Sequence, residues 1–226
     1  MSSPLGPLAP RTARWGGAVF VFGSLQFIAA MAYVQYRYPV YSDLTNYISD
    51  LGNFHDSPAY AVFNGSIILL GLLGLLGTAL VRTAFAARRS RTLGISALAV
   101  ASLGAIGVGI FPETATELGG SIHSVVSLVT FLGSGVALVF LGFAMLRDTR
   151  WEGFRGYTAL SGVVTLVALL VFLPASGGSA SGVGAYPGLI ERIIVAPILL
   201  WAIVAGLHLV RLPTYSPARF RPAAGE

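Results

Sequence analysis

Long apolar runs alternate with short polar segments along this chain, and the pattern predicts its architecture. Six of the runs have about the 17 to 25 residues that a helix needs to cross a bilayer. They cover residues 14–36, 58–85, 93–111, 119–146, 155–173 and 187–210. We therefore predict an all-α fold, a polytopic membrane bundle of six transmembrane helices.

Residues that begin and end helices agree with these limits. Ser57 and Pro58 provide an N-cap and a proline at the first helical position, and Pro213 follows the last run. The first run lacks a small-residue cleavage site, so we expect no cleaved signal peptide. The expected organisation is an N-terminal tail over residues 1–13, a single transmembrane domain over 14–210 and a C-terminal tail over 211–226.

Composition supports a membrane protein and excludes several kinds of chemistry. The mean hydropathy is +0.77. Only 10% of the 226 residues are charged, whereas soluble domains carry about a quarter. Cysteine is absent, which excludes disulfides, thiolate nucleophiles and cysteine-ligated metals.

The distribution of charge predicts an orientation. All 14 basic residues are arginine, which is typical of a GC-rich prokaryotic genome. Twelve of them lie on the side of the bundle that carries both termini, and six of the nine acids lie on the other side. Because cytoplasmic loops hold the excess of positive charge, we expect both termini to be cytoplasmic and the chain to lie in a prokaryotic plasma membrane. No basic patch is interleaved with aromatic residues, so we expect no nucleic acid partner.

The loop between the first two runs, YSDLTNYISDLGNFHDSPAY, is the most polar part of the chain. Its Ser-Asp-Leu triplet occurs twice, at 42–44 and 49–51, about two helical turns apart. This spacing predicts a short amphipathic helix with Asp43, Asn46 and Asp50 on one face and Ile48 and Leu51 on the other. Three arrangements stay open: a solvated cap, carboxylates turned inward over a cavity, or a segment that is not helical.

Other ionisable residues lie at the same level of the membrane. His123 is about one turn inside the fourth run, and Glu191 and Arg192 are about one turn inside the sixth. Such residues cost a few kcal/mol below the interface unless they pair or line water, so each indicates a functional site. We predict a polar pocket near the outer surface, built from Asn46, Ser49, Asp50, His55, Glu113, His123, Glu191 and Arg192.

Two of these residues have alternative roles. Arg192 either forms a structural clasp with Asp50 or Glu113, or anchors a phosphate or carboxylate of a ligand. His123 is either a hydrogen-bonded core residue or a general base. Glu191 and Arg192 are adjacent, so on a helix their side chains point about 100° apart and do not face one partner.

The histidines argue against a metal site. A catalytic zinc usually takes three protein ligands, and only His55 and His123 lie on the outer side. A site of two histidines and one carboxylate, from Asp50 or Glu113, stays open, but no HExxH-like spacing supports it. We therefore predict no metal and no other cofactor.

Three ordered motifs resemble one family. TNYISDLG at 45–52 is similar to the N-x-I-S-D/E-L-G signature of the membrane family called domain of unknown function 998. GIFPE at 109–113, followed by His123, and GLIER at 188–192 also resemble it. The resemblance implies a six-helix membrane protein with no established reaction. The I-S-D-x-G block is also distantly similar to the Frag/DRAM/Sfk group, which is linked with lipid handling.

These observations give one functional hypothesis and two alternatives. We expect the protein to bind a membrane lipid or small amphiphile, with Arg192 holding an anionic head group and the Asp50 segment acting as a lid. The first alternative is a membrane-embedded hydrolase or lipid-modifying enzyme, with His123 as catalytic base and Asp50 or Glu113 assisting it. The second alternative is a transporter. The sequence predicts no particular protein partner.

Overall fold

The computed structural model describes residues 11–113, 116–146, 148–175 and 185–212 of the chain. Most of the two predicted tails lies outside these residues. The described part is helical and contains no strand. Its six long helices are α1 (Arg11–Arg37), α2 (Tyr60–Val81), α3 (Arg89–Ile110), α4 (Thr116–Ala144), α5 (Phe154–Ala175) and α6 (Pro187–Arg211). All six contain spans long and apolar enough to cross a membrane, which confirms the predicted fold class.

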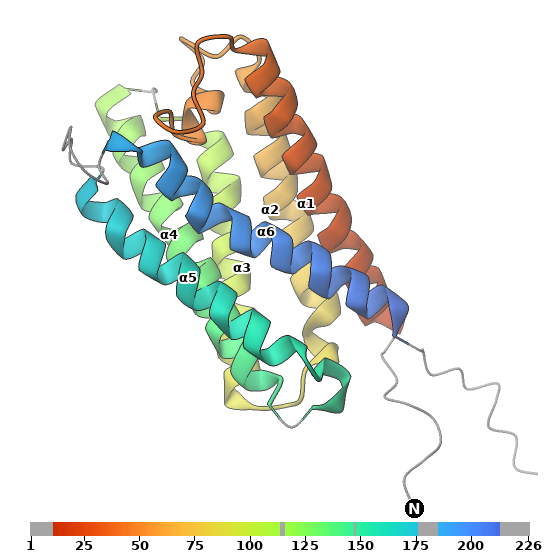
Figure 1. The fold of residues 1–226 in the computed structure, drawn as a ribbon. Helices are drawn as coiled ribbons and strands as arrows, with labels where there is room; N and C mark the ends of the chain where they lie inside the picture. The colour runs from red at the N-terminus through yellow and green to blue at the C-terminus, as the bar shows by residue number, and fades with distance from the viewer. Residues whose placement is uncertain (1–10, 114–115, 147, 176–184, 213–226) are drawn as a thin grey trace, which may run out of the picture.

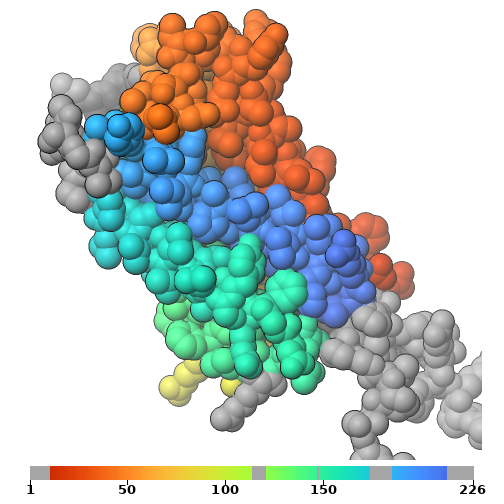
Figure 2. Space-filling view, viewed as in Figure 1, coloured from red at the N-terminus to blue at the C-terminus, as the bar shows by residue number. Residues whose placement is uncertain are grey.

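The six helices form a closed ring. Each helix packs against its neighbours in sequence, and α6 packs back against α1. Figure 1 shows α6 crossing the bundle obliquely, with the start of α1 and the end of α6 at the same end. The loop between α1 and α2 lies at the opposite end, and in Figure 2 it rests against the light-blue start of α6. This end of the bundle therefore gathers the residues of the predicted pocket.

Glycines permit the close approach of neighbouring helices. A Cβ atom at Gly71 of α2 would lie 2.6 Å from the backbone oxygen of Ser102 in α3. A Cβ atom at Gly17 of α1 would lie 2.5 Å from the backbone oxygen of Gly206 in α6, and the reverse distance is also 2.5 Å. In lipid, helices associate through such close packing, so this reciprocal contact closes the ring.

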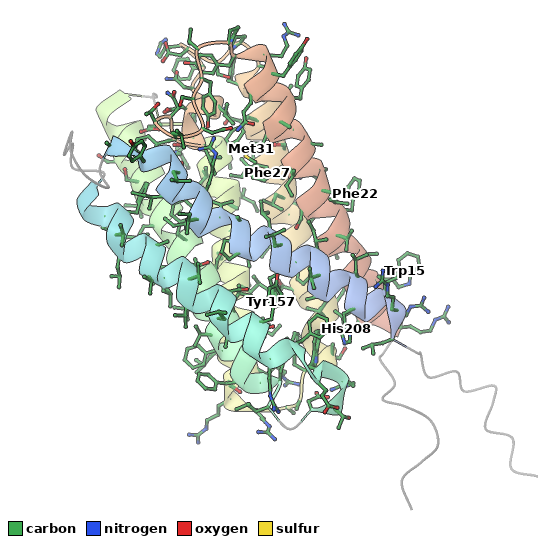
Figure 3. The ribbon with its side chains drawn as sticks, viewed as in Figure 1. Trp15, Phe22, Phe27, Met31, Tyr157 and His208 are labelled. Atoms are coloured by element: carbon green, nitrogen blue, oxygen red, sulfur yellow. The ribbon has the colours of Figure 1, made fainter. Side chains whose placement is uncertain are left out.

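Side-chain contacts hold the bundle together at one end and in its middle. At the end away from the α1–α2 loop, Trp151 stacks on Phe85 with ring centroids 4.9 Å apart. His208 donates from Nε2 to the carbonyl oxygen of Arg150 at 2.6 Å. Figure 3 places His208 at this end, and Phe27 and Met31 toward the other. Gln26 of α1 donates to the carbonyl oxygen of Ser66 in α2 at 3.0 Å, which satisfies a polar group in mid-helix.

The α1–α2 loop contains less helix than its repeat suggests. Only a four-residue 3-10 helix, η1 (Ser49–Gly52), forms within it, and turns precede it. The side chain of Asp50 accepts from the backbone N–H of Tyr47, and that of Asn46 accepts from the N–H of Ser42. Side chains that bond backbone groups in this way compete with a regular helix. Ile48 and Leu51 nevertheless turn inward, as the repeat predicts, and are 4% and 0% exposed.

We expect Gly17→Ala to destabilise the protein, because its methyl group overlaps the Gly206 backbone and overpacking costs about 1–3 kcal/mol. Gly65→Ala is the control, since nothing lies within 4 Å of a Cβ atom at Gly65. Thermal unfolding in detergent measures both variants. Equal midpoints for the two variants would show that the α1–α6 contact does not depend on glycine.

Candidate functional site

Arg192 fastens the α1–α2 loop to the start of α6. Its Nη2 donates to Oδ1 of Asp43 and to the hydroxyl of Tyr41, both at 2.6 Å. Its Nη1 donates to the carbonyl oxygens of Asn46 at 3.2 Å and Gly188 at 2.9 Å. A guanidinium group has five N–H donors, and these bonds account for four. Arg192 is therefore a clasp between the loop and α6.

The partner of the clasp differs from the expected ones. Asp43 receives Arg192, where the sequence suggested Asp50 or Glu113. The Asp43 side chain is 63% exposed and that of Arg192 is 19% exposed, so the pair lies at the surface of the loop. With one N–H donor left, Arg192 has little capacity to hold the anionic head group that the sequence suggested.

Tyr41 and Gly188 complete this contact. The Tyr41 hydroxyl donates to the carbonyl oxygen of Tyr47 at 2.8 Å. Burial raises the pKa of Tyr41 to about 12, so the phenol stays protonated and both donates and accepts. A Cβ atom at Gly188 would overlap the carbonyl oxygen of Asn46, so only glycine lets the loop backbone approach α6 this closely.

Asp50 braces the loop from within. Its Oδ2 accepts from Nδ2 of Asn46 at 3.0 Å and from the N–H of Tyr47 at 2.9 Å. Burial raises the pKa of Asp50 above its ordinary value, against the hydrogen bond from Asn46, and the negative charge of Glu113 raises it further. Asp50 and Asn46 thus have local structural partners, and neither lines the cavity described below.

Two carboxylates outside the loop hold its buried part. The N–H of Ile48 donates to Oε2 of Glu191 in α6 at 2.5 Å. The hydroxyl of Ser49 donates to Oε2 of Glu113, just after α3, at 2.9 Å. Asp50 lies within electrostatic range of Glu113. Four of the predicted pocket residues, Ser49, Asp50, Glu113 and Glu191, therefore converge around Ile48.

Hydrogen bonds to protein groups hold both ring nitrogens of His123. Its Nδ1 lies 2.8 Å from the carbonyl oxygen of Phe111, and a carbonyl only accepts, so Nδ1 carries the proton. Nε2 consequently accepts from the hydroxyl of Ser127 at 3.2 Å. Both ring nitrogens are thus engaged, and His123, which is 6% exposed, ties α4 to the end of α3. This geometry favours the hydrogen-bonded core residue over the general base.

His55 lies apart from the other predicted residues. It is exposed, and its ring lies against Phe54 with centroids 4.2 Å apart. Within the described ranges, no three histidine or acidic side chains come together in a way that could hold a metal ion.

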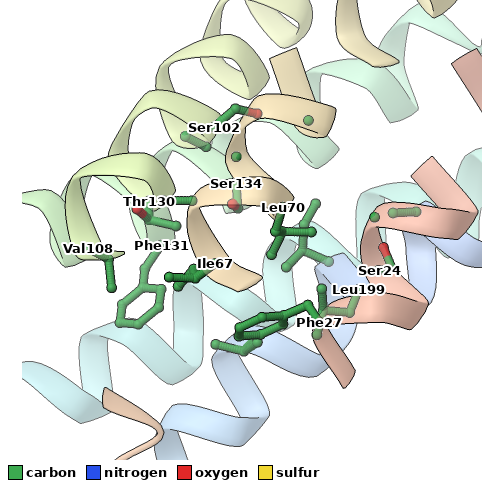
Figure 4. A pocket seen from close by; sticks show the side chains of 18 of the residues that line it. Ser24, Phe27, Ile67, Leu70, Ser102, Val108, Thr130, Phe131, Ser134 and Leu199 are labelled. Atoms are coloured by element: carbon green, nitrogen blue, oxygen red, sulfur yellow. The ribbon is translucent and has the colours of Figure 1, made fainter. Parts of the chain in front are cut away.

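A cavity of about 130 Å³ lies inside the ring, beneath the α1–α2 loop. Ile48, Ser49 and Glu191 line it on the side of the loop, and Trp201 lines it deeper along α6. Figure 4 shows side chains of its wall, among them Phe27, which are largely apolar. The lining residues come from the loop and from every long helix except α5.

Sequence reasoning missed this cavity. Its apolar lining residues are the same types that fill any helix interface. The available signal was the row of small hydroxyl residues on the inner faces of α3 and α4, Ser102, Ser127, Thr130 and Ser134, all of which line it. Of the predicted pocket residues, only Ser49 and Glu191 line the cavity.

Residues 21–208 match the family model described as a protein of unknown function (DUF998). The chain therefore belongs to this family, as its three motifs predicted. No curated protein and no solved structure matches the chain. The family description names no reaction, so a function has to be argued from the site itself.

We expect Arg192→Gln to loosen the α1–α2 loop, because it removes the bonds to Asn46, Tyr41 and Asp43. Hydrogen exchange of the peptide spanning residues 41–52 should become at least several-fold faster. Asp43→Asn should have a smaller effect, below about 1 kcal/mol, because Asp43 is largely exposed. Arg37→Gln is the control, since among the described residues Arg37 donates a hydrogen bond only to the Tyr33 hydroxyl of its own helix. Unchanged exchange in Arg192→Gln would exclude the clasp.

We expect His123→Ala to lower the stability of the protein by about 1–3 kcal/mol, because it removes the partners of Phe111 and Ser127. Thermal unfolding in detergent measures the change, with the exposed His55→Ala as control. A His123→Ala variant as stable as the wild type would contradict the structural role and revive the catalytic one.

Proposed function

We propose that this multi-pass membrane protein binds a small amphiphile, whose apolar part occupies the cavity inside the ring. The supporting observation is the cavity itself, with its apolar wall and its polar end at Ser49 and Glu191. An apolar cavity of about 150 Å³ in another protein binds benzene. The cavity here, at about 130 Å³, suits a ring-sized group or a short chain segment better than the two chains of a phospholipid.

An empty cavity of this size would destabilise the bundle. An empty cavity costs about 24 cal/mol per Å³, which for this volume is about 3 kcal/mol. Phe63, Ile67 and Leu199 of its wall belong to the buried core. Larger side chains at Ala105 or Ser102, which also line the cavity, would fill the space and avoid this cost. A ligand that occupies the cavity recovers part of this cost.

The α1–α2 loop is the proposed entrance. It covers the cavity with Ile48 and Ser49, and polar contacts to Glu191, Arg192 and Glu113 hold it in place. When the loop opens, water can replace these polar contacts. Separating two packed helices would instead lose apolar contacts that water does not replace. In the proposed function the loop opens to admit the ligand and closes over it, as the lid hypothesis suggested.

The catalytic and transport alternatives have less support. His123 and Asp50 are engaged by structural partners and do not line the cavity. Deeper in the bundle, Phe20 and Trp201 line the cavity with ring centroids 6.0 Å apart, and Trp201 donates to Thr158. A transporter needs a second opening to the other side of the membrane. This aromatic pair and the packed core beyond it close the path from the cavity to that side.

The proposed setting is a prokaryotic plasma membrane, with membrane lipid around the helices. The twelve arginines on the side of both termini support a cytoplasmic location for that side. The α1–α2 loop and the mouth of the cavity then face the outside of the cell, from which the ligand would enter. The proposal involves no nucleic acid and no cofactor.

Ala105→Leu tests the proposed use of the cavity. Ala105 is buried in the cavity wall, so the added carbon atoms should fill part of the space and weaken the binding of toluene at least tenfold. Ala79→Leu is the matched control on the exposed face of α2. Toluene binding is measured by titration calorimetry in nanodiscs, with protein-free nanodiscs subtracted. If neither the wild type nor the Ala79→Leu variant binds toluene, the cavity does not bind apolar molecules.

A further inference from the structure

We infer that the cavity selects an amphiphilic amine, whose protonated head group lies against Glu191. This inference rests on the proposed function and names the chemical class of its ligand. It replaces the anionic head group that the sequence suggested. Three features of the cavity support it: the buried carboxyl group of Glu191, the hydroxyl groups that already donate hydrogen bonds within the protein, and the distribution of charge.

Glu191 presents a carboxyl group to the cavity. The residue is 6% exposed and lines the cavity. Oε2 accepts from the N–H of Ile48, and no described residue donates a hydrogen bond to Oε1. An acceptor away from bulk water is less stable without a donor than with one. A donor on the ligand would therefore stabilise Oε1.

Four hydroxyl groups that line the cavity already donate their protons to protein acceptors. Ser49 donates to Glu113, and Ser127 donates to His123, whose Nδ1 proton is fixed by Phe111. Deeper in the cavity, the hydroxyls of Ser102 and Thr130 donate to backbone oxygens of their own helices. Each of these oxygens keeps only lone pairs for a ligand. The lining therefore offers acceptors at these four hydroxyls and at Glu191, whereas the hydroxyls of Ser24 and Ser134, which also line the cavity, can donate or accept.

The charges near the mouth favour a cation. Asp50, Glu113 and Glu191 act on one another electrostatically around Ile48. Arg192 also acts electrostatically on Glu191, but it does not line the cavity, and it pairs with Asp43 outside it. An anionic head group would meet like charges here, and like-charge contacts cost several kcal/mol.

An ammonium group matches the site better than a hydroxyl group. Both donate hydrogen bonds, but only an ammonium can also form an ion pair with Glu191, because a cation within hydrogen-bond distance favours the ionised form of a buried carboxyl group. An ammonium has three N–H donors and no lone pair, so it can bond Oε1 of Glu191 and neighbouring hydroxyl oxygens.

Four probes of nearly equal size test the inference: toluene, benzyl alcohol, benzylamine and benzoate. Each is titrated into the full-length protein in nanodiscs at neutral pH, where benzylamine is protonated. We expect benzylamine to bind at least tenfold more tightly than toluene, benzyl alcohol to lie between them, and benzoate not to bind.

Glu191→Gln is the decisive variant. Its side-chain oxygen can still accept from the N–H of Ile48, so the loop keeps its contact while the charge is lost. We expect this variant to lose the tenfold preference for benzylamine over toluene, whatever its own affinity for toluene. Ala105→Leu should weaken the binding of both probes, because it acts on the apolar part of the cavity.

The outcomes separate the two proposals. If no probe binds to the wild type, the proposed function fails. If toluene binds but benzylamine binds no better, or if benzoate binds as well as benzylamine, the cavity binds apolar molecules without selecting amines. If Glu191→Gln keeps the full preference for benzylamine, Glu191 does not recognise the head group. Should this variant not fold, the order of the four probes on the wild type decides alone.

Discussion

The buried backbone of the α1–α2 loop is the constraint on which this end of the molecule depends. Backbone polar groups at membrane depth need partners within the protein. Ile48 enters the bundle with its N–H pointing at Glu191, while the carbonyl oxygen of Asn46 faces Arg192. Because adjacent side chains diverge by about 100° around a helix, one turn of α6 supplies both an acceptor and a donor to different parts of the loop.

This arrangement also explains why a cavity exists beneath the loop. Polar contacts at its edge hold the loop in place, and Gly188 lets it rest directly on α6. The ring of helices is closed separately, by backbone contacts such as Gly17 on Gly206. Neither contact requires the centre of the ring to be filled, so the space between the helices remains open to a ligand.

The sequence predicted the helices and the clustering of polar residues because both follow from chain topology. Loops that alternate between two ends bring Ser49, Glu113 and Glu191 to one end, whatever the details of packing. The clasp partner could not be predicted, since Asp43 and Asp50 occupy equivalent places in the repeat and the fold of the loop decides between them. The helix predicted for the loop is shortened because Asp50 and Asn46 bond backbone N–H groups that a helix would use. The cavity lining differs from ordinary packing residues in Glu191 and in its serines and threonine.

In the proposed function, the clasp and the cavity together favour an amine over the phosphate groups of lipids. The outer end of the bundle lies among lipid head groups, and arginine is a natural partner for their phosphates. An unpaired Arg192 near the mouth would attract these abundant anions. Asp43 neutralises Arg192 outside the cavity, while Glu191 and several hydroxyl oxygens offer acceptors inside it. The site thereby disfavours the phosphate groups of the surrounding bilayer and remains available to a scarcer, donor-bearing amphiphile.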